Sequence, residues 1–423
     1  MSKKLMRKKL AMMLATLKKK RPFYTEVEYL ETKNQQTNDV STNAAAYIDT
    51  GIIPNNNTRI ECRMQFTTLI SGQNKEALSG ITGPESAPRF AWGFASISPY
   101  TNFYFGLGAQ NLTTSVTRDT NVHTFVLDAK NKTCSIDNTT QSFTSSGSLN
   151  GQRSIYLFAR HTTVEYANRP CNAKVYCCKI WDNDVLVRDM IPVLDWNYVP
   201  CMYDRITEQL FYNAGTGDFV AGRQIHPVEY IESTGTQYID TGVKLSSTSK
   251  VECSAEYTGV PTSGSSYLFG VYDNNKNFGL NSALRADPPR WFGVWYNQGT
   301  LTSYTVFTGL NTKYDVEVSS NGIYVNGELM SSVSGTFTGT ANAYLFWANG
   351  TTQPKSIMKM YRCKMWNSNN MVRDFIPAID ENDTFFMFDK ITHTTYNNSG
   401  SGSFIGPTVE KDENGKIVEP EYE

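Results

Sequence analysis

The residue types that perform acid–base and nucleophilic chemistry are present in this chain without the spacing that such chemistry needs. Glycoside hydrolysis requires two carboxylates facing one cleft, as a Glu-x-Asp-x-x-Glu run along a strand would arrange them, and neither half of the chain contains such a run. The histidines His123, His161, His226 and His393 do not recur at matching places with a serine or cysteine partner. We therefore expect a protein that is not an enzyme.

The eight cysteines do not have the spacing of metal ligands. Four of them correspond between the two halves, Cys62 with Cys253 and Cys178 with Cys363. Two interpretations stay open: one disulfide in each half, or buried free thiols that pack as small hydrophobic groups. Four further cysteines have no counterpart, so a repeated disulfide framework would use only half of the thiols. This pattern favours assembly in a reducing compartment.

Aromatic residues near arginines are the better binding candidates. Sugars stack on exposed aromatic faces, and a neighbouring arginine binds hydroxyl groups. Trp291 and Trp295 are four residues apart, so an extended strand places both on one face. The alternative is that these side chains pack in the core. The predicted glycan-binding residues are Arg89, Trp92, Arg290, Trp291 and Trp295.

Several charged residues occur twice in the same local sequence. Asp49 and Asp240 each lie in a Tyr-Ile-Asp-Thr-Gly run, which suits either a metal or glycan site or a turn in which the carboxylate accepts backbone amide bonds. The turn is the favoured interpretation. The Arg-Asp pairs at 188–189 and 373–374 are expected to be structural, because one member facing the core needs a fixed partner.

These repeated residues belong to a duplication with a period of about 200 residues. A period of that length is a whole domain rather than a solenoid unit. The equivalent Trp181 and Trp366 are expected to pack in the core or against a sheet. The repeated runs are Val-Glu-Tyr-(Leu/Ile)-Glu at 27–31 and 228–232, Tyr-Ile-Asp-Thr-Gly at 47–51 and 238–242, Lys-(Ile/Met)-Trp at 179–181 and 364–366, and Val-Arg-Asp-(Met/Phe)-Ile-Pro at 187–192 and 372–377.

Each half has the pattern of a β-protein. Polar and apolar residues alternate over 59–66 and again over 250–257, which is the period of a half-buried strand. Asn326-Gly327 predicts a tight hairpin. Aromatic residues make up 13% and charged residues 19% of the chain. The predicted fold is all-β, with antiparallel sandwiches over 23–224 and 225–407.

The N-terminal segment differs from the rest of the chain. Residues 1–21 contain nine basic and no acidic residues, whereas the remainder has 30 basic and 40 acidic residues. A helix is predicted over residues 3–20, and Pro22 ends it. Its apolar positions have heptad spacing, and so short a helix needs self-association or docking to be stable. The apolar positions are Met6, Leu10, Met13 and Leu17.

We interpret residues 1–22 as an anchoring helix that is retained in the mature protein. Its apolar stretch is short, and three lysines follow it where a signal peptidase site would lie. Anchoring or oligomerisation inside a protein assembly is the favoured role. Binding to anionic lipid and contact with packaged nucleic acid are the alternatives. At the other end, residues 408–423 are predicted to form an acidic flexible tail.

The repeated motifs together resemble the laminin-G-like, concanavalin-A-like jelly-roll modules that recur in gut bacterial surface proteins and in tailed bacteriophages. The resemblance covers about residues 26–224 and 227–407. It implies a two-sheet jelly roll, frequent glycan binding and, in some members, a calcium ion at the sandwich edge. No cofactor is required by the residues themselves, and a calcium site stays open.

A retained basic helix followed by two such modules resembles a phage structural protein. The expectation is a head or tail fibre or decoration subunit, assembled in the host cytoplasm and located in the virion. Its partners would be other virion proteins, bound through residues 1–22, and bacterial or mucosal glycans. A trimer is the hypothesis for the oligomer, because fibres that the chain resembles are commonly threefold. A bacterial cell-surface lectin and a glycoside hydrolase with an unrecognised site are the alternatives.

Overall fold

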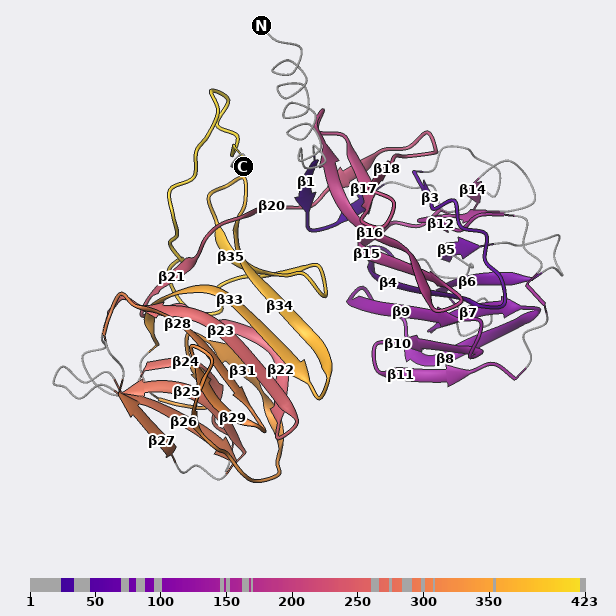
Figure 1. Cartoon of the computed structure of the whole chain (residues 1–423). Helices are drawn as coiled ribbons and strands as arrows, with labels where there is room; N and C mark the ends of the chain where they lie inside the picture. The colour runs from indigo at the N-terminus through magenta and orange to yellow at the C-terminus, as the bar shows by residue number, and fades with distance from the viewer. Residues whose placement is uncertain are drawn as a thin grey trace, which may run out of the picture. The chain divides into compact units, whose positions relative to one another are not determined.

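In the computed structural model, the described part of the chain consists of strands and the loops between them (Figure 1). No helix occurs among the residues that the structure describes, so the predicted all-β class is confirmed for that part of the chain. The predicted helix with Met6, Leu10, Met13 and Leu17 lies outside the described residues. These are residues 24–33, 46–69, 76–80, 88–94, 101–144, 148–149, 153–161, 167–168, 170–259, 266–273, 276–283, 291–297, 301–306, 309–352 and 355–418.

The chain divides into two compact units, Met1–Gly222 and Arg223–Glu423, called module 1 and module 2 below. The sequence places the boundary after residue 224. Each module contains two sheets whose inner faces together form one hydrophobic core. The duplication read from the sequence therefore corresponds to two separately packed sandwiches.

Module 1 has a large antiparallel sheet and a smaller one. The large sheet contains β1 (Tyr24–Val27), β2 (Leu30–Thr32), β4 (Thr58–Phe66), β9 (Val122–Asp128), β10 (Thr133–Ile136), β11 (Thr139–Ser142), β15 (Ala173–Asp182), β16 (Val185–Asp195), β17 (Pro200–Asp204), β18 (Gln209–Phe211) and β19 (Phe219–Ala221). The smaller sheet contains β3 (Ile48–Asp49), β5 (Glu76–Gly80), β6 (Arg89–Phe94), β7 (Asn102–Gly108), β8 (Gln110–Thr117) and β12 (Tyr156–Leu157), while β13 (Arg160–His161) pairs with β14 (Ala167–Asn168).

Module 2 repeats this arrangement. Its first sheet contains β20 (Gln224–Pro227), β21 (Ile231–Thr234), β23 (Ser249–Tyr257), β28 (Lys313–Ser319), β29 (Gly322–Val325), β30 (Glu328–Ser331), β33 (Ile357–Asn367), β34 (Asn370–Ile379), β35 (Phe385–Asp389) and β36 (Thr394–Tyr396). Its second sheet contains β22 (Ile239–Ser246), β24 (Ser266–Val271), β25 (Asn277–Ala283), β26 (Trp291–Asn297), β27 (Leu301–Val306), β31 (Thr338–Leu345) and β32 (Ala348–Asn349).

The alternating sequences form the strands predicted from them. Along β4 every second residue is buried, and β23 follows nearly the same pattern. The predicted hairpin at Asn326-Gly327 is also confirmed, because it joins β29 to β30 with φ angles of 51° and 82°. Two successive positive φ angles are what a type I′ turn requires, and Asn-Gly accepts them at little cost.

The repeated motifs, which are far apart in the sequence, meet around a buried ion pair in each module. In module 1, Arg188 Nε donates a hydrogen bond to the Thr50 carbonyl oxygen at 3.1 Å, and Arg188 Nη1 lies 3.6 Å from Asp204 Oδ2. In module 2, Arg373 makes the same bond to Thr241 and lies 3.7 Å from Asp389. The structural role predicted for both arginines follows from this geometry.

The repeated aspartates Asp49 and Asp240 form the turns that present these carbonyl groups. Asp49 Oδ1 accepts a bond from the Gly51 amide at 2.9 Å, and Asp240 Oδ1 accepts the equivalent bond from Gly242. Both glycines have positive φ angles, 69° and 66°, which favour glycine. The motif Tyr-Ile-Asp-Thr-Gly therefore encodes a turn, as its residue types predict.

The region predicted as an acidic tail has a local fold within residues 408–418. Lys411 and Ile417 form an antiparallel bridge, and Asp412 Oδ1 accepts bonds from the amides of Asn414 and Lys416 at 2.9 Å each. Lys411 Nζ also lies 2.6 Å from Asp383. These contacts tie this part of the segment back to module 2.

Candidate functional site

Of the five predicted glycan-binding residues, Arg89 and Trp92 lie on β6 of module 1, and Trp291 and Trp295 lie on β26 of module 2. Arg89 is half-buried at the start of β6, whereas Trp92 is fully buried. Arg290 lies outside the described residues, and Trp291 is described only by its place in β26. Trp295, also on β26, is half-buried.

The prediction that Trp92 binds a ligand is wrong. Its ring stacks on Phe125, with the ring centroids 5.6 Å apart and the planes at 7°, and its Nε1 donates to Met64 Sδ at 3.4 Å. Phe90, Trp92 and Phe94 occupy alternate positions of β6 and are all buried. That period of two was the sequence signal for a core position.

Trp295 covers a flat part of its sheet. Its ring centroid lies 4.8 Å from that of Tyr267 and 5.0 Å from that of Tyr272, both at the far side of β25. Gly279 on β25 pairs with Trp295, and Gly270 on β24 pairs with Gly279. Because neither glycine has a side chain, the Trp295 ring reaches across them. This ring therefore supports the sheet surface as much as it offers a binding face.

A group of three aromatic side chains and a lysine lies on the outer face of the second sheet of module 2. The ring of Tyr238 lies 4.8 Å from that of Tyr344 and 5.2 Å from that of Trp347. Lys355 Nζ lies 4.3 Å from the centre of the Trp347 ring. All four side chains are half-buried, so each keeps part of its surface in solvent. We call Tyr238, Tyr344, Trp347 and Lys355 the aromatic platform.

The two tyrosines of the aromatic platform face solvent because side chains alternate between the two faces of a strand. Ile239 and Leu345, which neighbour Tyr238 and Tyr344 in the sequence, are fully buried in the core. Successive strand residues point to opposite faces, so the tyrosines face away from the core. Burial raises the pKa of Tyr344, with Asp240 adding to the effect. The Tyr344 hydroxyl therefore stays protonated, and it can donate as well as accept hydrogen bonds.

Polar groups border the platform. Asp240 pairs in register with Tyr344, and Asn342 Nδ2 donates to Asp240 Oδ1 at 3.1 Å. A carboxylate, an amide and the Lys355 ammonium thus lie around flat aromatic faces. Such a surface stacks against the apolar face of a sugar ring and binds its hydroxyl groups at the edge.

Module 1 has an aromatic cluster at the equivalent place. Asp49 pairs with Tyr156 as Asp240 does with Tyr344, and the Tyr47 ring stacks on that of Tyr156 at 4.4 Å. His161 stacks on the other side of the cluster, 4.0 Å from Tyr156 and with the planes at 9°. Burial lowers the pKa of His161, so its ring is neutral near pH 7. Module 1 therefore presents a cluster of different composition and charge.

The repeated Trp181 and Trp366 lie outside the hydrophobic cores and pack against a sheet, which is one of the two positions predicted for them. Each lies half-buried on a sheet surface below a basic side chain from the neighbouring strand. The Arg59 guanidinium lies 4.2 Å from the Trp181 ring centre, and Lys250 Nζ lies 3.9 Å from that of Trp366. These pairs stabilise the sheet surface through cation–π contact.

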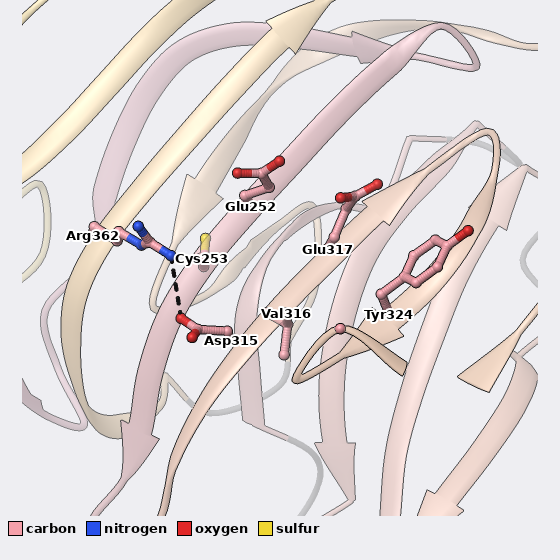
Figure 2. A pocket seen from close by; sticks show the side chains of 8 residues that line it. Glu252, Cys253, Asp315, Val316, Glu317, Tyr324 and Arg362 are labelled. Atoms are coloured by element: carbon pink, nitrogen blue, oxygen red, sulfur yellow. Dashed lines mark ion pairs between the residues drawn. The ribbon is translucent and has the colours of Figure 1, made fainter. Parts of the chain in front are cut away.

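A shallow hollow of about 300 Å³ opens on the first sheet of module 2 (Figure 2). Glu252 and Glu317 lie opposite each other on β23 and β28, and Tyr324 continues the row on β29. Arg362 and Asp315 form an ion pair at 3.5 Å at its side. In module 1 the position opposite Glu61 is Val126, so the facing pair of glutamates is not repeated there.

Both glutamates of the hollow already have partners within module 2. Lys250 Nζ lies 2.6 Å from Glu252 Oε1, and Ser319 Oγ donates to Glu317 Oε1 at 2.9 Å. Among the described residues, no group of three histidine, cysteine or carboxylate side chains has the arrangement of a metal site. The hollow is therefore a paired, charged part of the surface, and the aromatic platform is the stronger candidate.

The cysteines that correspond between the modules face each other across neighbouring strands. Cys62 pairs in register with Cys178 on β15, and Cys253 with Cys363 on β33, where the sulfur atoms are 2.7 Å apart. All four are buried free thiols. Burial raises the pKa of Cys62 and of Cys253 well above the usual range. Each module thus contains one cross-strand pair of free thiols in its core.

His123 on β9 lies between two carboxylates of module 1. Its Nδ1 is 2.7 Å from Asp137 Oδ2, and its Nε2 is 2.8 Å from Asp119 Oδ1. The hydrogen bond with Asp137 raises the pKa of His123. Both ring nitrogens of His123 thus contact carboxylates, and these contacts link β9 to the turns beside it.

Comparisons with known proteins give a limited result. No family model matches the chain, and no curated protein matches it. Among solved structures it is similar to the mouse laminin alpha1 chain, domains LG4-5, with 9% sequence identity. The match covers 84% of this chain and 92% of that chain, with a TM-score of 0.29. No helix among the residues described here is long and apolar enough to cross a membrane.

Proposed function

We propose that this chain is a non-enzymatic, carbohydrate-binding adhesion protein whose glycan site in module 2 is the aromatic platform. One observation carries the proposal. Both modules place aromatic side chains at the same point of the outer sheet face, beside the repeated aspartates Asp49 and Asp240. In module 2 the three aromatic side chains keep part of their surface in solvent, whereas Tyr156 of module 1 is buried, so the accessible aromatic faces are those of module 2.

The chemistry of the platform suits a sugar better than an apolar ligand. The Trp347 and Tyr238 faces offer stacking surfaces, and the Lys355 ammonium and Asp240 carboxylate supply a donor and an acceptor. Because module 1 replaces Trp347 and Lys355 with a cluster built on His161, the two modules bind different glycans, or only module 2 binds one.

We also propose that the protein is a bacteriophage structural protein, a head or tail fibre or decoration subunit. The support is the polarity of the sequence, in which a strongly basic segment over residues 1–21 precedes two acidic modules. In this proposal residues 1–22 attach the chain to other virion proteins, and the modules display the glycan site. A trimer remains part of the proposal.

Trp347→Ala is expected to weaken glycan binding at least ~10-fold, the loss that accompanies removal of an aromatic hot-spot residue. A glycan array containing neutral and acidic sugars identifies a ligand for the full chain. Calorimetric titration of the wild type and the variant with that ligand then gives the two affinities. The matched control is Trp366→Ala, because Trp366 is also half-buried below a lysine but lies on the other sheet.

Two results would contradict the glycan proposal. One is an array on which the full chain binds no sugar. The other is an equal loss of affinity in the Trp347→Ala and Trp366→Ala proteins, which would mean that binding depends on the general stability of module 2 rather than on the platform.

Deleting residues 1–21 is expected to abolish incorporation into phage particles while both modules stay folded. The physical reason is that the deletion removes nine basic groups and the apolar seam in one step. Quantitative mass spectrometry of purified particles from complemented infections measures incorporation, and circular dichroism of the purified variant checks folding. Normal incorporation of the truncated chain would refute the anchor, and its recovery from a bacterial envelope would favour a surface lectin.

A further inference from the structure

Module 1 exposes an unusual group of apolar side chains at the turn between β16 and β17. Trp196 is 69% exposed, Tyr198 45% and Val199 43%, and Tyr212 beside the turn is 45% exposed. Isolated exposed apolar residues need no explanation, but several together mark an interaction surface. We call these four residues the aromatic turn.

The aromatic turn is held in one conformation. Asp195 is buried, and its Oδ1 accepts hydrogen bonds from the amides of Asn197 and Val199 at 2.8 Å each. Tyr212 Oη donates to Asp195 Oδ2 at 3.0 Å, which ties that ring to the turn. The exposed side chains are therefore presented by a rigid backbone, as an interaction surface requires.

Module 2 has the same turn with entirely polar side chains. Asp380 Oδ1 accepts bonds from the amides two and four residues later, at 2.9 and 2.8 Å, as Asp195 does. The four positions of the aromatic turn are occupied there by Glu381, Asp383, Thr384 and Asn397.

The backbone of the turn favours the polar version. Tyr198 has a φ of 62° and the equivalent Asp383 a φ of 63°. Asn and Asp adopt this left-handed region more readily than a bulky residue does. A tyrosine at that position costs stability relative to the residue used in module 2, so the aromatic turn has a role beyond forming the turn.

In module 2, the chain that leads into the module contacts this turn. Arg223 Nε lies 3.2 Å from Asp380 Oδ2, and Arg223 Nη1 donates to Asn397 Oδ1 at 2.7 Å. The Gln224 amide donates to Glu381 Oε2 at 2.9 Å. The polar turn is therefore matched to a polar leading segment.

In module 1, the leading segment arrives at the same place. Tyr24, the first residue that the structure describes, pairs in register with Asp195 at the start of the aromatic turn. The chain upstream is residues 1–23, which carry an apolar seam instead of the polar Arg-Gln of module 2. Six residues separate Leu17 from position 23, and an extended chain of that length reaches ~20 Å.

We propose that the aromatic turn is the docking surface for residues 1–21 of the same chain, bound through the seam of Met6, Leu10, Met13 and Leu17. In each module the leading segment of the chain then contacts the same turn. The two contacting surfaces are apolar in module 1 and polar in module 2. Docking covers the seam and leaves the basic side chains available to a partner. The proposal does not depend on what either module binds.

The test replaces the aromatic turn with the side chains of module 2, Trp196→Glu, Tyr198→Asp and Val199→Thr, in the full chain. Residues 1–21 contain nine lysines and arginines, so trypsin reports their accessibility. We expect cleavage within residues 1–21 to become at least ~10-fold faster, because protease cleavage follows the population of the undocked segment. Ile206→Thr, at an exposed apolar residue of the next turn, is the matched control and should leave the rate unchanged.

A second variant keeps the test independent of the folding of module 1. Leu10→Asp with Leu17→Asp changes only the segment, and it is expected to increase hydrogen exchange at residues 195–200 while residues 380–385 of module 2 stay unchanged. Equal cleavage and exchange in all proteins would overturn the proposal. Protection that disappears on dilution would also overturn it, because the segment would then be docking on a second copy.

Discussion

Replacing Asp389 with alanine is expected to lower the free energy of unfolding of module 2 by about 3–5 kcal/mol, the cost of breaking a buried ion pair by removing one partner. Asp389 is fully buried and accepts hydrogen bonds from the amides of Asp374, Ile391 and Thr392 and from the Thr392 hydroxyl. The substitution leaves those donors and the Arg373 guanidinium without their acceptor.

The two modules provide an internal control for this prediction. Asp204→Ala removes the equivalent carboxylate and should destabilise module 1 alone, so hydrogen exchange resolved by residue distinguishes the two effects. Asp315→Ala removes an exposed carboxylate, 59% accessible, whose ion pair with Arg362 is worth at most about 1 kcal/mol. A loss below about 1 kcal/mol for Asp389→Ala would contradict the role assigned to the repeated ion pair.

Trp92→Ala is expected to destabilise module 1 by about 3–5 kcal/mol, the range for replacing a buried aromatic residue with alanine. The substitution opens a cavity between the two sheets, where the ring now contacts Phe105, Phe125 and Met64. Chemical denaturation followed by circular dichroism measures the loss. Because Trp92 belongs to module 1, the glycan binding proposed for module 2 should not change.

Trp181→Ala is the control for Trp92→Ala. Trp181 lies half-buried on the sheet surface below Arg59, so its removal leaves no closed cavity and a smaller loss of stability is expected. If the two variants were equally stable, Trp92 would have to be a surface residue, and the ligand-binding interpretation drawn from its sequence would be restored.

The parts of the fold that follow from local sequence could be predicted. The alternation of polar and apolar residues in β4 and β23 predicts which face of each strand is buried. Asn326-Gly327 predicts the hairpin between β29 and β30. The repeat gives two modules, because equivalent sequences fold into equivalent structures. These predictions succeed because the physical cause acts between residues that are near each other in the chain.

The candidate site could not be predicted in the same way. Tyr238 and Tyr344 meet because β22 pairs with β31, and no local pattern fixes a pairing over that separation. Trp92 was misassigned because a nearby arginine and an aromatic run suit both a sugar site and a core strand. The alternation of large aromatic residues (Phe90, Trp92 and Phe94) with the small Ala91 and Gly93 distinguishes a core strand from a sugar site.

The buried ion pair also determines when a module can finish folding during synthesis. Arg188 bonds to a carbonyl group 138 residues earlier, and Arg373 to one 132 residues earlier. A nascent chain that ends before Arg188 contains the early turn at Thr50 but lacks its partner, and one that ends before Asp204 still lacks the carboxylate of the ion pair. β-folds with such distant contacts form slowly. Module 1 therefore completes its closure only after its last strands have left the ribosome, while module 2 is being made. Since domains fold in order of synthesis, premature termination within β15 to β17 would leave an open sandwich rather than a shorter stable one.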